Sequence, residues 1–293
     1  MRSGGRSDET LRVIEDSATV CLELESRPDS VTLVRSALSG LGERLELEPE
    51  LLDDLKTAVS EACNNVVLHA YGSGSGPLTV SLTITSEGVD VLVRDRGSGI
   101  QRVSAAEDRM GVGLAVISAL ADRAEFLSGP DGGTDVRMSF NRGGAGLELA
   151  PGALGASSDA EPVSLPGDVI LSLAPVTILA HVFGRLARAV AAGSHFSVDR
   201  FSDLYPLADA IAAHAEVAGT GGPITCSINS SSRRLELLLA PFAPGSGARL
   251  APEPEAEPGA RPLAGLADQL SVEAMNGCEL LRIVIVDHRR GRD

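Results

Sequence analysis

Residues 61–71 read Glu-Ala-Cys-Asn-Asn-Val-Val-Leu-His-Ala-Tyr. Glu61, Asn65 and His69 recur every four residues, so on a helix they share one face, one turn above another. The other side of that helix is apolar and is predicted to be buried, through Leu55, Val59, Cys63 and Val66. An amide oxygen and a carboxylate on one polar stripe suit the binding of a hard cation and the transfer of a proton.

Three glycine-containing motifs follow in the chain. Asp95-Arg96-Gly97-Ser98-Gly99 comes directly after an apolar strand pattern. Its glycines would let the backbone approach a flat ligand closely, and the carboxylate could accept a hydrogen bond from an amine of that ligand. Gly111-Val112-Gly113-Leu114 is predicted to open a helix from Leu114 to about Arg123, whose free N–H groups and dipole would hold a phosphate. Gly132-Gly133-Thr134 is predicted to turn into a strand. Taken singly, each motif also fits an ordinary turn.

In this order, E-A-x-x-N-x-x-x-H-A-Y, D-x-G-x-G, G-x-G-L and G-G-T-x-V resemble the GHKL ATPase superfamily. The stretch from Glu61 to Tyr71 resembles the N-box of its anti-sigma-factor serine kinase branch. The resemblance covers roughly residues 10–141. It implies an α+β fold of the GHKL (Bergerat) type, a two-layer sandwich of helices over a mixed, mainly antiparallel sheet, with Mg²⁺ and ATP bound between helices and a lid loop.

The resemblance also implies roles for single residues. Glu61 would be catalytic and activate the hydroxyl of an acceptor serine, Asn65 would be the Mg²⁺ ligand, and Asp95 would bind the adenine amino group. Residues 100–110 would form a short lid with few basic residues. The other nucleotide-binding residues would be Gly97 and Gly99 at the base, Gly111, Gly113 and Leu114 at the phosphates, Arg109 at the γ-phosphate, and Thr134 beside Asp95.

Three functions are compatible with this pattern. The first is a serine/threonine protein kinase that phosphorylates a small anti-sigma-factor antagonist and itself binds a sigma factor. The second is an ATP-responsive switch that sequesters a partner without phosphate transfer, and the third is an orphan histidine-kinase catalytic domain. The position of Glu61, four residues before Asn65, favours the first over the second. The absence of a helical phospho-acceptor histidine segment upstream weighs against the third.

Composition narrows the partners and the location. The 293 residues carry a formal net charge of -15, which disfavours nucleic acid and anionic membranes as partners. The four cysteines follow no disulfide or metal-site spacing, and the N-terminus lacks the apolar core of a signal peptide. The apolar stretch 171–193 is interrupted by a histidine and two arginines, so it is not expected to span a membrane. These features predict a cytoplasmic protein and leave open whether the chain forms a homodimer.

The expected organisation is a disordered segment 1–9, an ATP-binding kinase-like domain 10–142, a flexible linker 143–167 rich in Gly, Ala, Ser and Pro, and a second domain 168–288. Asp29 and Ser30 are candidate N-caps for the first helix. In the first half, helices are predicted to about Leu45 and from about Pro49 to Tyr71, and strands over 78–85, 89–94, 124–127 and 134–140.

The second half repeats the layout of the first, which indicates an internal duplication. Aligning Asp54-Leu55 with Asp203-Leu204 places Ala210, His214 and Ala218 where Glu61, Asn65 and His69 stand. The motif residues are lost while the apolar periodicity survives, so a degenerate GHKL-like domain that binds no nucleotide is expected. Its predicted elements are strands over 169–173, 224–229, 234–240 and 280–286, and helices over 174–193 and about 198–218.

Overall fold

The computed structural model describes residues 16–99, 108–129, 132–141, 160–250 and 263–288, together with 147, 149 and 154–156. The disorder predicted for residues 1–9 and most of the predicted lid, 100–107, lie outside the described residues.

The first half contains the two long helices and the strands that the sequence predicts, with bounds that differ by a few residues. Its elements are β1 (Asp16–Glu25), α1 (Pro28–Leu45), α2 (Pro49–Asn65), the π-helix η1 (Val66–Ala70), β2 (Pro77–Ile84), β3 (Val89–Asp95), α3 (Asp108–Leu120), β4 (Arg123–Ser128) and β5 (Thr134–Phe140).

Two helix starts differ from the prediction. Helix α1 begins at Pro28, whose fixed φ suits the first helical position, and Arg27 is its N-cap. Helix α3 begins at Asp108, six residues before Leu114. The prediction that Gly111 and Gly113 precede this helix was therefore wrong, because both glycines lie inside its first two turns.

The second half has the same kinds of elements. The single helix expected over 198–218 is divided at Asp203 into two helices. The elements are β7 (Val169–Ala174), the 3₁₀ helix η3 (Val176–Ile178), α4 (Leu179–Gly193), α5 (Val198–Ser202), α6 (Leu204–Ala218), β8 (Ile224–Ser231), β9 (Arg234–Phe242), the 3₁₀ helix η4 (Ser246–Leu250), α7 (Leu263–Leu266), β10 (Gln269–Met275) and β11 (Cys278–Val286).

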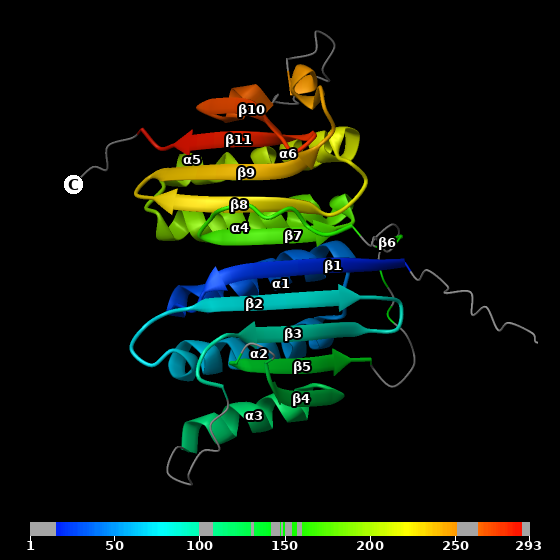
Figure 1. Ribbon diagram of the computed structural model, residues 1–293, viewed down its shortest axis with the longest axis vertical. Coiled ribbons are helices and arrows are strands. Elements are labelled where there is room, and N and C mark those ends of the chain that lie inside the picture. The colour runs from blue at the N-terminus through cyan, green and yellow to red at the C-terminus, as the bar shows by residue number, and fades with distance from the viewer. Residues whose placement is uncertain are drawn as a thin grey trace, which may run out of the picture.

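All of the described strands belong to one sheet with the order β10-β11-β9-β8-β7-β1-β2-β3-β5-β4 (Figure 1). The remaining strand, β6 (Gly155–Ala156), pairs with the start of β1. Every described pairing is antiparallel, so the α+β class is confirmed, with an antiparallel sheet instead of a mixed one. The order β1-β2-β3-β5-β4 of the first half recurs as β7-β8-β9-β11-β10 in the second.

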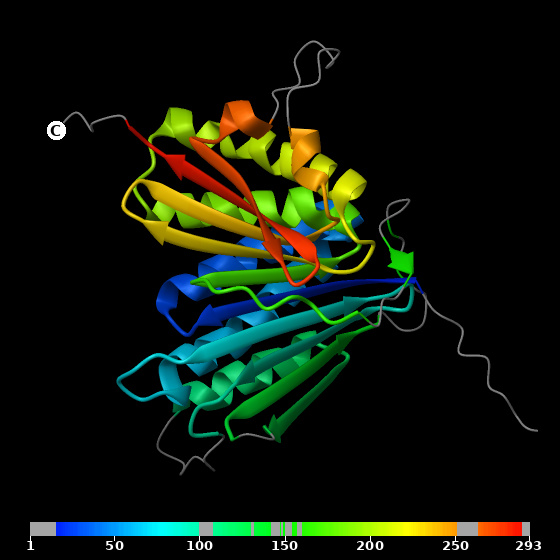
Figure 2. The same ribbon diagram turned by 45° about the horizontal axis from the view of Figure 1, so that its top comes forward.

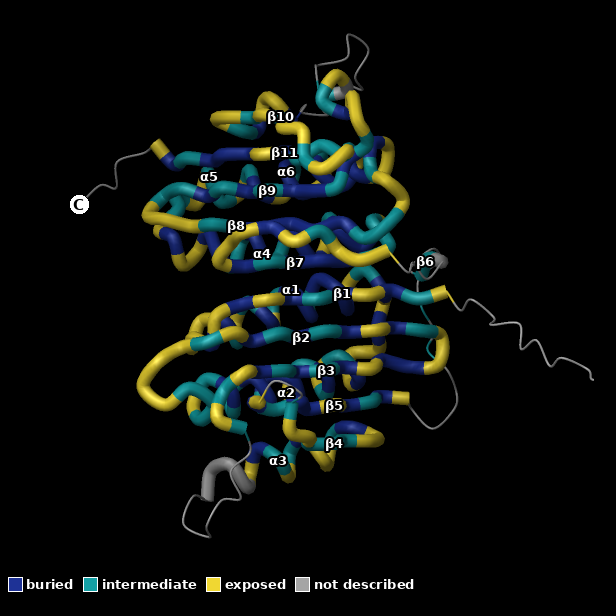
Figure 3. The backbone as a smooth tube through the Cα atoms, in the orientation of Figure 1, coloured by how far each residue is buried: buried dark blue, intermediate teal, exposed yellow. Residues whose placement is uncertain are grey.

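The long helices cover one face of this sheet, which gives a two-layer architecture (Figures 1 and 2). Buried residues alternate with exposed ones along β1 and line the strands beneath the helices (Figure 3). The apolar side of α2 is buried as predicted, through Leu55, Val59, Cys63 and Val66. The polar stripe with Glu61 and Asn65 is thereby turned away from the core.

The end of the predicted linker packs against the outer face of the second half. Leu165 is buried, and the Ser227 hydroxyl donates a hydrogen bond to the carbonyl of Pro166. Strand β8 is buried on both faces from Ile224 to Ile228. Residues 160–167 therefore form part of the folded unit, while flexibility of the rest of 143–167 stays a prediction, because most of residues 142–159 lie outside the described residues.

One described segment, Val176–Gly193, is long and apolar enough by composition to cross a membrane, and half of it is buried within the protein. It contains α4, which packs against α1 and α6. The hydrophobicity of this helix is accounted for by its place in the core.

Candidate functional site

Glu61 and Asn65 meet the start of helix α3 at Gly113. A Cβ built on Gly113 would lie 3.3 Å from Oε2 of Glu61 and 3.3 Å from Oδ1 of Asn65. Both side chains are half-buried, and the two oxygens therefore face the same point on α3. A side chain at this position would require the carboxylate and the amide to give by a few tenths of an ångström.

The polar stripe continues past the end of α2 in the π-helix η1. His69 lies there, half-buried, and the carbonyl of Ala70 accepts a hydrogen bond of 2.9 Å from the backbone N–H of Ser98. The Tyr71 hydroxyl donates to the carbonyl of Pro77 at 2.6 Å and accepts from the N–H of Arg96 at 2.8 Å. These bonds attach the loop after β3 to the end of the helix that carries Glu61 and Asn65.

Asp95 ends strand β3 and is buried, with 3% of its surface exposed. Its Oδ1 accepts a hydrogen bond of 2.7 Å from the N–H of Gly97, and Thr134 donates to the carboxylate through its backbone and its hydroxyl. Burial raises the pKa of Asp95, and these hydrogen bonds oppose that rise. An ionised carboxylate has roughly four acceptor sites, so one remains for an additional donor.

Close backbone contacts surround Asp95, and the glycines permit them. A Cβ on Gly97 would lie 2.2 Å from the carbonyl oxygen of Ala70, and one on Gly133 would lie 2.2 Å from that of Asp95. Gly99 and Gly133 also have φ values of +75° and +72°, which side chains rarely adopt. The D-x-G-x-G and G-G-T motifs thus form one structure around the acid.

A bidentate ion pair lies beside this structure. Arg94 donates to both carboxylate oxygens of Asp135 at 2.7 and 2.8 Å, across strands β3 and β5. The hydrogen bonds from Arg94 lower the pKa of the buried Asp135 carboxyl. The pair fixes the strand ends from which Asp95 and Thr134 project.

The predicted phosphate-binding segment is only partly described. Leu114 is half-buried in α3 next to Gly113. Arg109 and Gly111 lie on the same helix by their backbone, and their surroundings fall outside what the structure describes. The predicted contact of Arg109 with a γ-phosphate stays a prediction.

Tyr71 and Gly133 are site residues that sequence reasoning undervalued. Tyr71 stands in the quoted helix motif, and its ring lies against Gly76, where a Cβ would come within 2.3 Å of the ring. Gly133 immediately precedes Thr134. A tyrosine followed by a glycine-rich break, and two successive glycines before a strand, are the signals that point to them.

The side chains present are compatible with a hard cation and an adenine base. The Nδ2 atom of Asn65 is buried and has no hydrogen-bond partner in the described part of the chain, so its N–H groups are available to donate to an acceptor such as a phosphate oxygen, while its Oδ1 would be the atom that binds a cation. Amide and carboxylate oxygens are the donors that Mg²⁺ accepts, usually together with water and substrate phosphates. The described residues contain no group of three or more His, Cys, Asp or Glu for a metal held by protein alone.

In the second half, an acidic side chain occupies the glycine-containing loop that follows β9. Glu279, at the start of β11, accepts hydrogen bonds from the N–H of Gly245 at 2.7 Å, the N–H of Gly247 at 3.0 Å and the Ser246 hydroxyl at 2.7 Å. His214 packs against Phe242 with ring centroids 5.0 Å apart and ring planes tilted by 43°. The donors of the loop 245–247 and the His214 side of α6 are therefore already in contact with other side chains of the second half.

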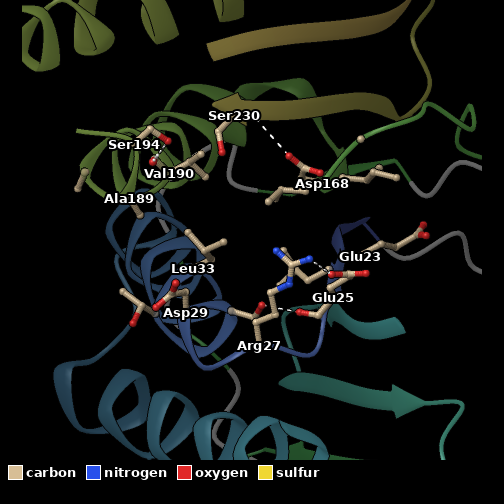
Figure 4. A pocket seen from close by; sticks show the side chains of 18 of the residues that line it. Glu23, Glu25, Arg27, Asp29, Leu33, Asp168, Ala189, Val190, Ser194 and Ser230 are labelled. Atoms are coloured by element: carbon tan, nitrogen blue, oxygen red, sulfur yellow. Dashed lines mark hydrogen bonds and ion pairs between the residues drawn. The ribbon is translucent and has the colours of Figure 1, made fainter. Parts of the chain in front are cut away.

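A cavity of about 830 Å³ lies apart from these motifs, between the two halves (Figure 4). Glu25 and Arg27 form an ion pair on one side, and Asp168 accepts a hydrogen bond from the N–H of Ser230 on the other. The cavity contains none of the predicted nucleotide-binding residues.

Comparisons with known proteins agree with the motifs. Residues 24–140 match the family described as the histidine kinase-like ATPase domain. The chain is 32% identical to the anti-sigma F factor of Caldanaerobacter subterraneus subsp. tengcongensis over 128 residues, which are 40% of this chain and 90% of that protein. It is 35% identical to the serine-protein kinase RsbW of Listeria monocytogenes serotype 4a over 135 residues, 41% of this chain and 85% of that protein.

Proposed function

The chain belongs to the family of histidine kinase-like ATPases that contains the anti-sigma F factors and the RsbW serine-protein kinases, and we propose from this premise that it is an ATP-dependent serine/threonine protein kinase. Its substrate would be a serine or threonine of a small anti-sigma-factor antagonist. A sigma factor would be its second partner. We place the protein in the cytoplasm, with no direct contact to nucleic acid or membrane.

The convergence of Glu61 and Asn65 on Gly113 carries the proposal. A cation ligand alone would suffice for a nucleotide-binding switch, whereas phosphate transfer to a hydroxyl also benefits from a base. Glu61 provides a carboxylate one helical turn from the amide of Asn65, and its Oε2 faces the same glycine. This pair supports a kinase over a non-catalytic switch.

The nucleotide would be held by residues from three motifs. Asp95 would accept a hydrogen bond from the adenine amino group through its remaining acceptor site, with Thr134 holding the carboxylate and Gly97 and Gly99 lining the base. Asn65 would bind Mg²⁺, which supplies charge neutralisation at the phosphates. Arg109, Gly111, Gly113 and Leu114 would face the phosphates.

In the reaction, Glu61 would accept the proton of the acceptor hydroxyl. The hydroxyl oxygen forms a bond to the γ-phosphorus of ATP as the bond from that phosphorus to the bridging oxygen breaks, which leaves ADP and a phosphoserine or phosphothreonine. Asn65 and Gly113 act by position: the amide lies one turn from the carboxylate, and the glycine leaves room for both side chains.

The second half, 168–288, would be a degenerate copy of the first that binds no nucleotide. The recurring strand order supports the duplication. The loss of the motif residues at Ala210 and His214, and the occupation of the glycine loop by Glu279, support the loss of binding.

Replacement of Glu61 by glutamine tests the kinase assignment. We expect Glu61→Gln to bind ADP with unchanged affinity and to transfer phosphate about 10²- to 10⁴-fold more slowly to an antagonist-type protein. Asp53→Asn is the matched control, because it removes one charge from an exposed position of the same helix. The rate is measured with labelled ATP and a purified antagonist from the same genome.

Two results would contradict the assignment. Equal transfer rates in Glu61→Gln and the wild type would exclude Glu61 as the base. A wild-type protein that binds ATP and the antagonist without any transfer would support the partner-sequestering switch.

A further inference from the structure

The seam between the two halves joins equivalent positions. Strand β1 pairs with β7 in antiparallel register, and Leu22 stands opposite Leu171. The difference in numbering between these leucines equals that between Leu55 and Leu204, which the sequence pattern aligns independently. Two copies of one element related by a two-fold axis place one residue opposite its own counterpart. The halves therefore meet as the subunits of a symmetric dimer meet.

The helices above the seam follow the same arrangement. Helices α1 and α4, which occupy equivalent places in the two halves, lie side by side (Figures 1 and 2). Their contact is close at Gly40, where a Cβ would lie 2.3 Å from the carbonyl oxygen of His181. At its rim, Arg185 donates to Oε2 of Glu43 at 2.7 and 2.9 Å.

This seam uses the surfaces of the first half that would otherwise be open. Strand β1 is paired with β2 along one edge and with β7 along the other, so its backbone groups are engaged on both sides. An uncovered edge of this length would be a template for pairing with another chain. The relatives are covered almost whole by the first half alone, so the second half is additional in this chain.

We infer that the second half is a permanent partner subunit built into the chain, which occupies the β1 edge and the α1 face in place of a second copy of the first half. The full chain is a monomer in solution. It has the shape of a dimer and only one set of nucleotide motifs. This inference goes beyond the proposed function, because the contact between the halves requires neither a bound nucleotide nor catalysis.

The test uses the full chain with a site for a sequence-specific protease inserted between Pro151 and Gly152, and light scattering without nucleotide. We expect the uncut chain to have the mass of one 30.2 kDa chain over a wide concentration range. After cleavage, two fragments should separate in denaturant and remain one particle of the same mass in native buffer. A dimeric uncut chain, or fragments that part in native buffer, would overturn the inference.

Charge substitutions at the seam verify the contact surface. Glu43→Arg replaces the ion pair by two neighbouring arginines. An exposed ion pair contributes roughly two- to fivefold to an association constant, so the cut halves should associate at least that much more weakly. Adding Arg185→Glu to Glu43→Arg exchanges the charges and should restore the wild-type affinity. If the double variant associates no better than Glu43→Arg, the halves do not meet at this seam. The association is measured without kinase activity, so its outcome is independent of the test of the proposed function.

Discussion

The backbone N–H of Gly97 donates a hydrogen bond of 2.7 Å to Oδ1 of Asp95, two residues earlier in the chain. The acid is thereby held by its own loop, and Thr134 holds it from the neighbouring strand. A carboxylate fixed in this way keeps its orientation without a ligand. This arrangement predicts that the charge of Asp95 can be removed with little rearrangement of the backbone.

Asp95→Asn should therefore lose nucleotide affinity and keep the fold. The amide replaces an acceptor by a donor, which cannot accept from the adenine amino group. A hydrogen bond to a charged group contributes about 1.5–3 kcal/mol, so ADP affinity should fall roughly 10- to 100-fold. Calorimetry measures the affinity, and circular dichroism checks the fold.

Asp90→Asn is the control, because Asp90 is an exposed acid on the same strand. It should bind ADP like the wild type. Unchanged affinity in Asp95→Asn would exclude this residue from the base site.

Gly113→Ala tests the contact between α2 and α3. The added methyl group would lie 3.3 Å from both Glu61 and Asn65, so these side chains must shift. Alanine favours a helix by up to about 1 kcal/mol over glycine, and this gain opposes the cost of the closer contact. The melting temperature should therefore change little. The shift needed is a few tenths of an ångström. Since a displacement of about 1 Å at a reacting group costs on the order of 10²-fold, we expect phosphate transfer to fall about tenfold.

Gly193→Ala provides the comparison for this variant. It makes the same change at the end of α4, where an added Cβ would meet nothing within 4 Å. Full transfer activity in Gly113→Ala would show that Glu61 and Asn65 need no fixed position beside this glycine.

The sequence predicted the local elements well, because each rests on a short-range pattern. The four-residue spacing of Glu61 and Asn65 and the alternation along β3 required no knowledge of distant contacts. The start of α3 was missed because two glycines usually interrupt helices, whereas here Gly113 is kept by its contact with Glu61 and Asn65.

Contacts between distant segments were harder to predict from the sequence. The pairing of β1 with β7 joins segments about 150 residues apart, and no local pattern specifies which edge strands meet. The role of Glu279 was also missed, because the acid that binds the glycine loop comes from the start of β11, while in the first half Asp95 comes from the end of β3.

Glu279→Gln should alter the pH dependence of stability. Hydrogen bonds from the Ser246 hydroxyl and from the backbone of Gly245 and Gly247 lower the pKa of Glu279. Its folded pKa lies below its unfolded value, ordinarily about 4.3, so its contribution is present above that pH and is lost as the pH falls through the folded pKa. The variant should unfold at lower urea concentration than the wild type at pH 7, and this difference should shrink below about pH 4.3.

Glu273→Gln, at an exposed position of the neighbouring strand β10, is the control and should unfold like the wild type at both pH values. A difference between Glu279→Gln and the wild type that is independent of pH would show that the ionised carboxylate does not support the loop.

The full chain should bind one adenine nucleotide. In the second half, both oxygens of Glu279 accept from the donors of the loop 245–247, and the ring of His214 on α6 packs against Phe242. A nucleotide would have to displace the carboxylate and would meet its negative charge. Titration of the full chain with ADP and Mg²⁺ should give a stoichiometry of one per chain, and Asp95→Asn should weaken that single binding event. A stoichiometry of two nucleotides per chain would show that the second half has kept a working nucleotide site.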